Sequence, residues 1–163
     1  MSNKIKPIPD GYHTLSAYLI VRGAASAIEF YKKAFGAAEL TRLNLPDGKI
    51  AHGEFKIGDS IFMISDENPD WGSTSPKTLG GSPVTLHLYV PDVDTTFANA
   101  IHAGAVEKMP LENQFWGDRT CQIVDPFGHY WHIATHIEDV DPSELPSRME
   151  AFMSTHKGCV SQA

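Results

Sequence analysis

The sequence has little of several features that mark specialised classes of protein. It contains 2 cysteines in 163 residues, Cys121 and Cys159, so a disulfide framework is not expected and a cytoplasmic location is the simpler prediction. Its 13 basic residues are outnumbered by 20 acidic ones, and the net charge of -7 disfavours binding to nucleic-acid phosphates. No apolar run is long enough to span a membrane, and no basic segment followed by an apolar one opens the chain, so no membrane contact and no secretory signal are expected.

The order of the predicted elements occurs twice. The first half of the chain predicts a strand at 14–21, a helix at 24–35 and strands at 38–45, 49–57 and 60–64. The second half predicts a strand at 84–90, a helix at 93–103 and strands at 105–109, 119–124 and 130–136. Gly36 and Gly104 follow the two helices, where glycine commonly ends a helix. The repetition predicts an α+β fold of two βαβββ modules, with helices outside, in a single domain over residues 1–163.

The first module covers about residues 12–67 and the second about 83–140, and residues 68–82 link them. The linker is rich in Gly, Ser and Pro, so it is expected to be a connector, with a mobile flap over a site as the alternative. Residues 141–163 are expected to form a helical tail. Because Pro146 would interrupt a helix, we expect one short turn followed by a helix over residues 147–155.

Strand alternation indicates which side chains could share a pocket. The helices must cover an apolar face of each strand, so the polar positions that alternate with it face the opposite, concave side. The alternative is a solvated sheet face, which is common in antiparallel sheets. The side chains expected on the concave side are Ser16, Tyr18, His52, Glu54, Met63, Thr85, His87, Gln122 and His132.

Residues outside this alternation receive separate predictions. Trp116 and Arg119 are expected to line the mouth of the pocket, because an indole and a guanidinium suit a planar or anionic ligand. Core packing is the alternative for Trp116. His129 and His136 are expected to be structural or exposed. Cys121 is expected to point away from the concave side, so no Cys–His nucleophile pair is predicted.

The repeated modules, the helix "IEFYKKAFG" (28–36) and the segment "DPFGHYWHIATH" (125–136) resemble the vicinal oxygen chelate superfamily. That superfamily includes glyoxalase I, extradiol dioxygenases and the bleomycin and fosfomycin resistance proteins. The segments at 51–67 and 115–140 resemble its PhnB-like branch, and the resemblance covers about residues 12–140. It implies a glyoxalase-like cup or barrel and a homodimer. The methyltransferase name sometimes given to this branch does not fit, because no glycine-rich turn follows a strand.

The resemblance also implies four positions that hold a metal ion in metal-using members. In this sequence they are Ser16, Met63, Thr85 and His132, of which only His132 is an ordinary ligand, so no metal and no cofactor are expected.

Three functions follow as hypotheses. The favoured one is a metal-free protein that binds a small molecule in the cup. The second is a metal-dependent lyase, isomerase or dioxygenase that uses a shifted set, His52, Glu54, His87 and His132. The third is a cofactor-free enzyme with His132 or His87 as general base.

Overall fold

The computed structural model describes residues 5–155, so Cys159 and the end of the predicted tail lie outside the described residues. The first module consists of β1 (Tyr18–Val21), α1 (Ala24–Phe35), β2 (Ala38–Asn44), β3 (Ile50–Ile57) and β4 (Ser60–Asp66). The second consists of β5 (Thr85–Tyr89), α3 (Val93–His102), β6 (Val106–Asn113), β7 (Asp118–Val124) and β8 (Tyr130–His136). The short helices η1 (Pro69–Trp71) and α2 (Pro76–Leu79) lie in the linker, and α4 (Leu145–Thr155) follows the second module.

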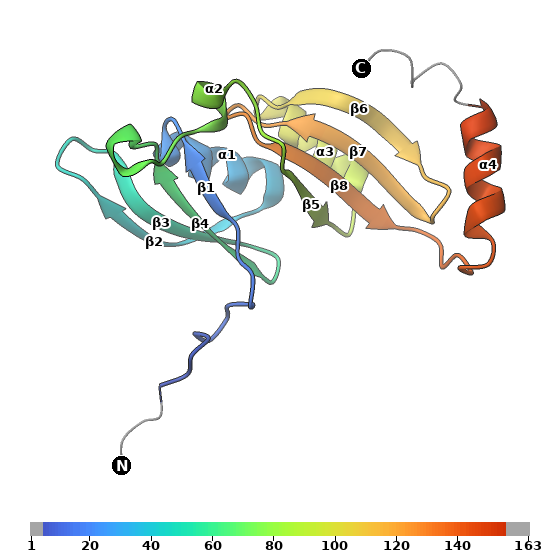
Figure 1. Ribbon diagram of the computed structural model, residues 1–163, viewed down its shortest axis with the longest axis horizontal. Helices are drawn as coiled ribbons and strands as arrows, with labels where there is room; N and C mark the ends of the chain where they lie inside the picture. Colours follow the sequence, from blue (N-terminus) through green and yellow to red (C-terminus); the bar gives the residue numbers. More distant parts are fainter. Residues whose placement is uncertain (1–4, 156–163) are drawn as a thin grey trace.

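The two modules form two open four-stranded sheets with the same topology. Their strand orders are β1-β4-β3-β2 and β5-β8-β7-β6, so the first strand of each module pairs in parallel with the last and the other pairs are antiparallel. Both sheets lie in front of α1 and α3 in Figure 1. This architecture confirms the predicted α+β fold of two βαβββ modules, although the sheets do not close into a barrel within the described residues.

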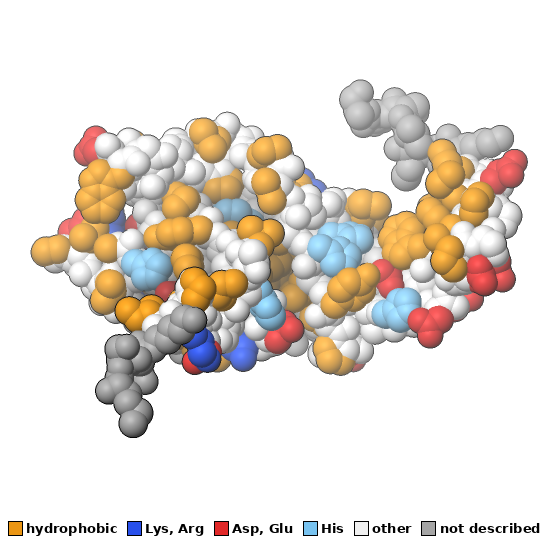
Figure 2. Space-filling view, turned by 60° about the horizontal axis from the view of Figure 1, so that its bottom comes forward, with side chains coloured by type: hydrophobic (Ala, Val, Ile, Leu, Met, Phe, Trp, Pro, Cys, Tyr) orange, Lys and Arg blue, Asp and Glu red, His pale blue; other side chains and the backbone are white. Residues whose placement is uncertain are grey.

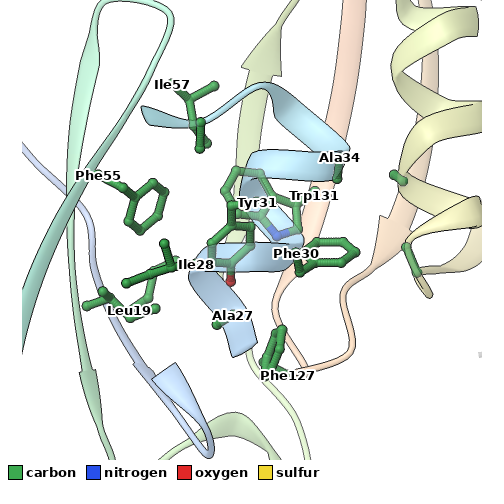
Figure 3. Packing of buried hydrophobic residues seen from close by; sticks show 14 of the residues in the cluster. Leu19, Ala27, Ile28, Phe30, Tyr31, Ala34, Phe55, Ile57, Phe127 and Trp131 are labelled. Carbon is green, nitrogen blue, oxygen red and sulfur yellow. The ribbon is translucent and has the colours of Figure 1, made fainter. Parts of the chain in front are cut away.

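The two modules share one hydrophobic core on the helix side of the sheets (Figure 3). The Tyr31 ring of α1 stacks on Phe55 at 5.0 Å between centroids and lies 5.5 Å from Trp131 of the other module. The Tyr31 hydroxyl and the Trp131 indole both donate to the buried carboxylate of Asp125, at 2.8 and 2.9 Å. Because a buried carboxylate is stable only when it is hydrogen-bonded, this contact fixes the DPFG turn against α1 of the first module.

The linker is more ordered than a simple connector. Ser75 caps α2 by accepting a hydrogen bond from the Thr78 backbone N–H, and the Ser75 and Thr78 hydroxyls both donate to Glu67. Arg22 also pairs with Glu67. Hydrogen bonds from Thr78, Arg22 and Ser75 lower the pKa of Glu67 to about 2, so this carboxylate stays charged near neutral pH and holds the linker on the first module.

Three element boundaries differ from the sequence prediction. β1 begins at Tyr18, so Ser16 precedes the strand. β6 extends through Pro110, which an edge strand tolerates because no neighbour needs its missing N–H, and the pairing with β7 is irregular there. α4 begins at Leu145, because Pro146 falls in the first helical turn, where its missing N–H removes no helical hydrogen bond. None of the described helices is both long and apolar enough to cross a membrane.

Candidate functional site

The candidate site lies on the open faces of the two sheets, the faces away from α1 and α3. Each sheet carries a row of three directly paired residues on its open face. The first row is Tyr18, Met63 and Glu54, on β1, β4 and β3. The second row is His87, His132 and Gln122, on β5, β8 and β7. All six were predicted for the pocket, and equivalent strands of the two modules place them at equivalent positions.

The central feature of the second row is a direct contact between two imidazoles. The Nδ1 atoms of His87 and His132 are 2.9 Å apart, and the ring centroids are 4.9 Å apart. Such a contact is a hydrogen bond only when one Nδ1 carries a proton and the other does not. Neither Nε2 has a hydrogen-bond partner among the described residues. A neutral pair therefore presents one nitrogen acceptor and one N–H donor to a ligand.

The pKa of His132 is lowered, which favours its neutral form. Burial is the largest cause, the positive charge of a protonated His87 adds to it, and Asp118 opposes both. His87 itself is exposed on the open face. At neutral pH the pair therefore contains at least one uncharged imidazole, which can either accept or donate a proton.

A second cluster beside this pair is centred on Asp118, the first residue of β7. Its side chain is buried and accepts hydrogen bonds from the Tyr89 hydroxyl at 2.9 Å and the Trp116 indole at 3.0 Å. Its other oxygen lies 2.8 Å from Nδ1 of His136. The Tyr89 ring also lies 4.6 Å from the His87 ring, between centroids. Asp118 thus fixes three ring side chains next to the imidazole pair.

In the Asp118 cluster, hydrogen bonds stabilise the ionised form of Asp118 and the protonated form of His136. Burial acts to raise the pKa of Asp118, but hydrogen bonds from His136, Tyr89 and Trp116 outweigh it and leave the pKa below its ordinary value. The pKa of His136 is raised, first by its hydrogen bond to Asp139 and second by that to Asp118. The cluster therefore holds an ionised carboxylate and a histidine that is readily protonated.

The first module presents a smaller polar group. The Tyr18 hydroxyl lies 3.2 Å from Nδ1 of His52, and Nε2 of His52 lies 3.2 Å from Glu54. The pKa of Glu54 is lowered by a hydrogen bond from Tyr12 and, after the opposing effect of burial, by His52. Tyr18 is 48% exposed, so this group is open to a ligand or to another chain.

The remaining predicted residues are placed as follows. Thr85 lies on the open face two residues before His87, and Ser16 lies just before β1, outside the row. Trp116 contacts the site through Asp118. Arg119 differs from the prediction, because it lies on the helix side and pairs with Asp94 of α3 at 2.7 Å. Its neighbour Cys121, also on that side, is buried as expected.

Tyr89 and Asp118 were not predicted for the site, whereas His136 is exposed, as predicted, and contacts Asp118. The predicted strand begins at residue 119, whereas β7 begins at Asp118, and its two-residue period places Asp118 on the open face and Arg119 on the other. His136 was expected to be structural or exposed because it stands at the end of β8. A signal was present, since His136 alternates with His132 along the same strand.

The fit of these residues to a metal ion is incomplete within one chain. Two Nδ1 atoms converge at His87 and His132, but no group of three or more possible ligands occurs among residues 5–155. A stable site for a divalent ion takes three or four protein ligands. His52 and Glu54 belong to the other sheet and are not part of the same group.

Comparisons with known proteins agree with this fold. The family model described as the glyoxalase/bleomycin resistance protein/dioxygenase superfamily matches residues 12–133. An uncharacterized protein of Mycobacterium bovis is 44% identical over 140 residues, which cover 84% of this chain and 92% of that protein. The crystal structure of TioX from Micromonospora has a TM-score of 0.62 at 25% identity and covers 77% of this chain and 99% of TioX. The PhnB protein of Bacillus cereus, at 17% identity and a TM-score of 0.58 over 76% of this chain and 99% of its own, supports the fold alone.

Proposed function

Because the chain belongs to the glyoxalase/bleomycin resistance protein/dioxygenase superfamily, we propose that it binds a small molecule on the open face that carries His87 and His132. Members of this superfamily bind small molecules and often form dimers. The observation that carries the proposal is the 2.9 Å contact between the two Nδ1 atoms. It leaves one Nε2 as a donor and the other as an acceptor, which matches a ligand with adjacent acceptor and donor groups, such as an amide, a lactam or a protonated carboxylic acid.

The neighbouring side chains define the rest of the ligand. Tyr89, 60% exposed, and Trp116, 37% exposed, offer aromatic surface beside the imidazole pair. Aromatic rings bury large apolar areas and favour stacked or edge contacts with other planar groups. Gln122, in the same row, adds an amide that can donate and accept. A planar, neutral or zwitterionic molecule with an amide-like edge satisfies these groups best.

We further propose that a second copy of the chain closes the site. The open faces leave Tyr18, Tyr89 and Met109 between 48% and 60% exposed, and the two sheets remain separate within residues 5–155. A twofold dimer would place the first row of one copy opposite the second row of its partner at two equivalent sites. Binding in the cytoplasm is part of the same proposal, since the described cysteine, Cys121, is a free thiol.

A ligand screen by thermal shift tests the binding proposal. We expect compounds with an amide-like edge to raise the melting temperature of the wild-type protein, and His132→Ala to abolish that rise while it remains folded. His102→Ala is the matched control, because His102 lies on α3. A rise that survives in His132→Ala would contradict the proposal.

A second candidate is a metal-dependent lyase, isomerase or dioxygenase. The observation that favours it is the convergence of two Nδ1 atoms, since imidazoles that share a metal ion also bring their nitrogens close together. In the proposed dimer, His52 and Glu54 of the second copy would have to supply the missing ligands. Elemental analysis of protein purified without a metal-binding tag separates the candidates. Binding without metal predicts far less than one equivalent of zinc, nickel, iron or manganese, whereas one equivalent that is lost in both His132→Ala and His52→Ala supports the metal enzyme.

A further inference from the structure

Apart from the open faces, the structure has a cavity at the junction of the two modules, between β1, the linker and the start of β5. Its volume is about 340 Å³, within the range of small-molecule sites. Its lining is mainly apolar and includes Ile20, Leu79, Val84 and Leu86, and no Asp, Glu, Lys or Arg is among the described residues that line it. A charged ligand would therefore lose its hydration there without gaining an opposite charge.

The wall of this cavity contains one buried polar ring, that of His129. The residue is 9% exposed, and its buried Nδ1 has no hydrogen-bond partner among the described residues. Nδ1 lies 3.8 Å from the Asp125 carboxylate, beyond hydrogen-bonding distance. That carboxylate already accepts hydrogen bonds from the Tyr31 hydroxyl and the Trp131 indole. A buried polar group without a partner is unfavourable, so His129 calls for an explanation.

The short helix α2 covers the cavity and is fixed at two points, which gives the cavity a defined shape. Gly128 adopts φ +96°, and a Cβ added there would approach Cβ of Pro76 to 3.0 Å, so the start of α2 packs directly on the DPFG turn. On its other side α2 is held to Glu67 by the hydroxyls of Ser75 and Thr78. The capped helix therefore keeps the cavity open beside His129.

We propose that this cavity is a second ligand site, for a small, neutral and mostly apolar molecule with one hydroxyl group, such as a phenol, whose hydroxyl pairs with His129. The apolar lining receives the hydrocarbon part, and the imidazole receives the one polar group. Burial lowers the pKa of His129 against the opposing charge of Asp125, so a neutral ring is available to accept or donate. This site lies within one copy and shares Tyr18 with the open face, but neither His87 nor His132 is among its lining residues.

Phenol and toluene are a matched pair of probes, because they have nearly the same size and differ in the hydroxyl. Titrations followed by NMR of the histidine ring resonances are expected to shift His129, with phenol binding about threefold to tenfold tighter than toluene, the range of one neutral hydrogen bond. His129→Leu should remove the advantage of phenol and leave toluene binding. His102→Leu, on α3, should change neither affinity.

Val84→Trp is a second test that does not depend on whether His129→Leu folds. Val84 is 60% exposed and lines the cavity, so its replacement fills the cavity from the rim. It should abolish the binding of both probes while the His129 resonance remains dispersed. Equal affinity for phenol and toluene, phenol binding that is unchanged in His129→Leu, or no binding of either probe by the wild-type protein would each overturn the proposal. Phenol-induced shifts at His87 and His132 in place of His129 would overturn it as well, and would point to the open-face site.

Discussion

At the scale of single residues, the contact between His87 and His132 makes two imidazoles behave as one unit. They pair directly across the parallel strands β5 and β8, so the backbone register holds the rings together. Two protonated imidazoles at 2.9 Å between Nδ1 atoms would repel each other, so the pair resists double protonation. Because the contact uses both Nδ1 atoms, only the two Nε2 atoms of the pair remain to form hydrogen bonds with a ligand.

The pKa of His132 is therefore expected to lie below the ordinary histidine value when it is measured by NMR titration. His87→Gln should raise it, because glutamine retains much of the side-chain volume and removes the like charge. Because this pKa is lowered in the fold, protonation of His132 opposes folding, so the contribution of His132 to stability is lost as the pH falls through its folded pKa. A His132 pKa above the ordinary value, or one that is unchanged in His87→Gln, would contradict this account of the pair.

Asp118 is predicted to position the rings around the pair. Asp118→Asn keeps the shape but removes the charge that three donors share, and it should lower the free energy of unfolding by about 1–3 kcal/mol. It should also lower the pKa of His136. Chemical denaturation and NMR titration measure the two effects.

Asp139→Asn is the control for Asp118→Asn. Asp139 is fully exposed and contacts His136 from the solvent side, so its replacement should also lower the pKa of His136. It should leave the Trp116 indole resonance unchanged, whereas Asp118→Asn should shift it. Since the pKa of His136 is raised in the fold, its stabilising effect is complete below the ordinary histidine pKa and is lost as the pH rises through its folded value. Equal effects of both variants on Trp116 would show that Asp118 is not the organising residue.

At the scale of elements, the turn between β6 and β7 places Asp118 at the start of its strand. Gly117 adopts φ +98° there, and its backbone N–H donates to Gln114. A Cβ at this position would lie 2.1 Å from the carbonyl oxygen of Glu138, in the segment that leads to α4. The turn, the end of β8 and the start of the tail therefore pack together only when residue 117 has no side chain.

Gly117→Ala is expected to lower the free energy of unfolding by about 2–4 kcal/mol, because backbone strain and a steric clash act together. Gly48→Ala is the matched control: it shares a positive φ of 85° but meets no atom within 4 Å, so about 1–2 kcal/mol is expected. Denaturant unfolding measures both. An equal decrease in the free energy of unfolding in the two variants would mean that the close approach to Glu138 does not affect stability.

The elements were also the part of the fold that the sequence predicted best. Alternation along β3, β5 and β8 assigned His52, His87 and His132 to the open face, where the structure has them, because the alternating apolar residues of each strand pack in or against the core, fully buried in β3 and β8 and partly buried in β5. The separate prediction for Arg119, which rested on residue type and not on alternation, was wrong, because Arg119 lies on the helix side of β7 and pairs with Asp94. The contact between His87 and His132 depends on the register of two strands 45 residues apart, which no local pattern contains.

At the scale of the whole molecule, the two sheets stand side by side with their open faces uncovered. Figure 2 shows histidine and hydrophobic side chains at several places on the surface, and hydrophobic ones gathered over α4. On that helix Met149 and Met153 are 45% and 54% exposed, and no residue of α4 is buried. An 11-residue helix is marginal in water without packing, so α4 also favours a second copy against this side.

Closure by a second copy predicts that the sites are shared between chains. An equal mixture of His52→Ala and His132→Ala subunits, exchanged under mild denaturation, should recover ligand binding at about a quarter of the sites of the wild-type dimer, because about half of the dimers are mixed and one of the two sites in each mixed dimer has both rows intact. Each variant alone should bind weakly. Binding by the mixture no better than by either variant alone would place both rows of each site in the same chain.

The most direct test of this account is the mass of the protein in solution, measured by multi-angle light scattering across a wide range of concentration. A mass of twice the 17.9 kDa of a single chain is expected, because in the proposed dimer the open faces of one copy are closed by those of the other. The mass of a single chain at every concentration would contradict the central claim, since the row with Tyr18 and the row with His132 would then have no partner to form a pocket.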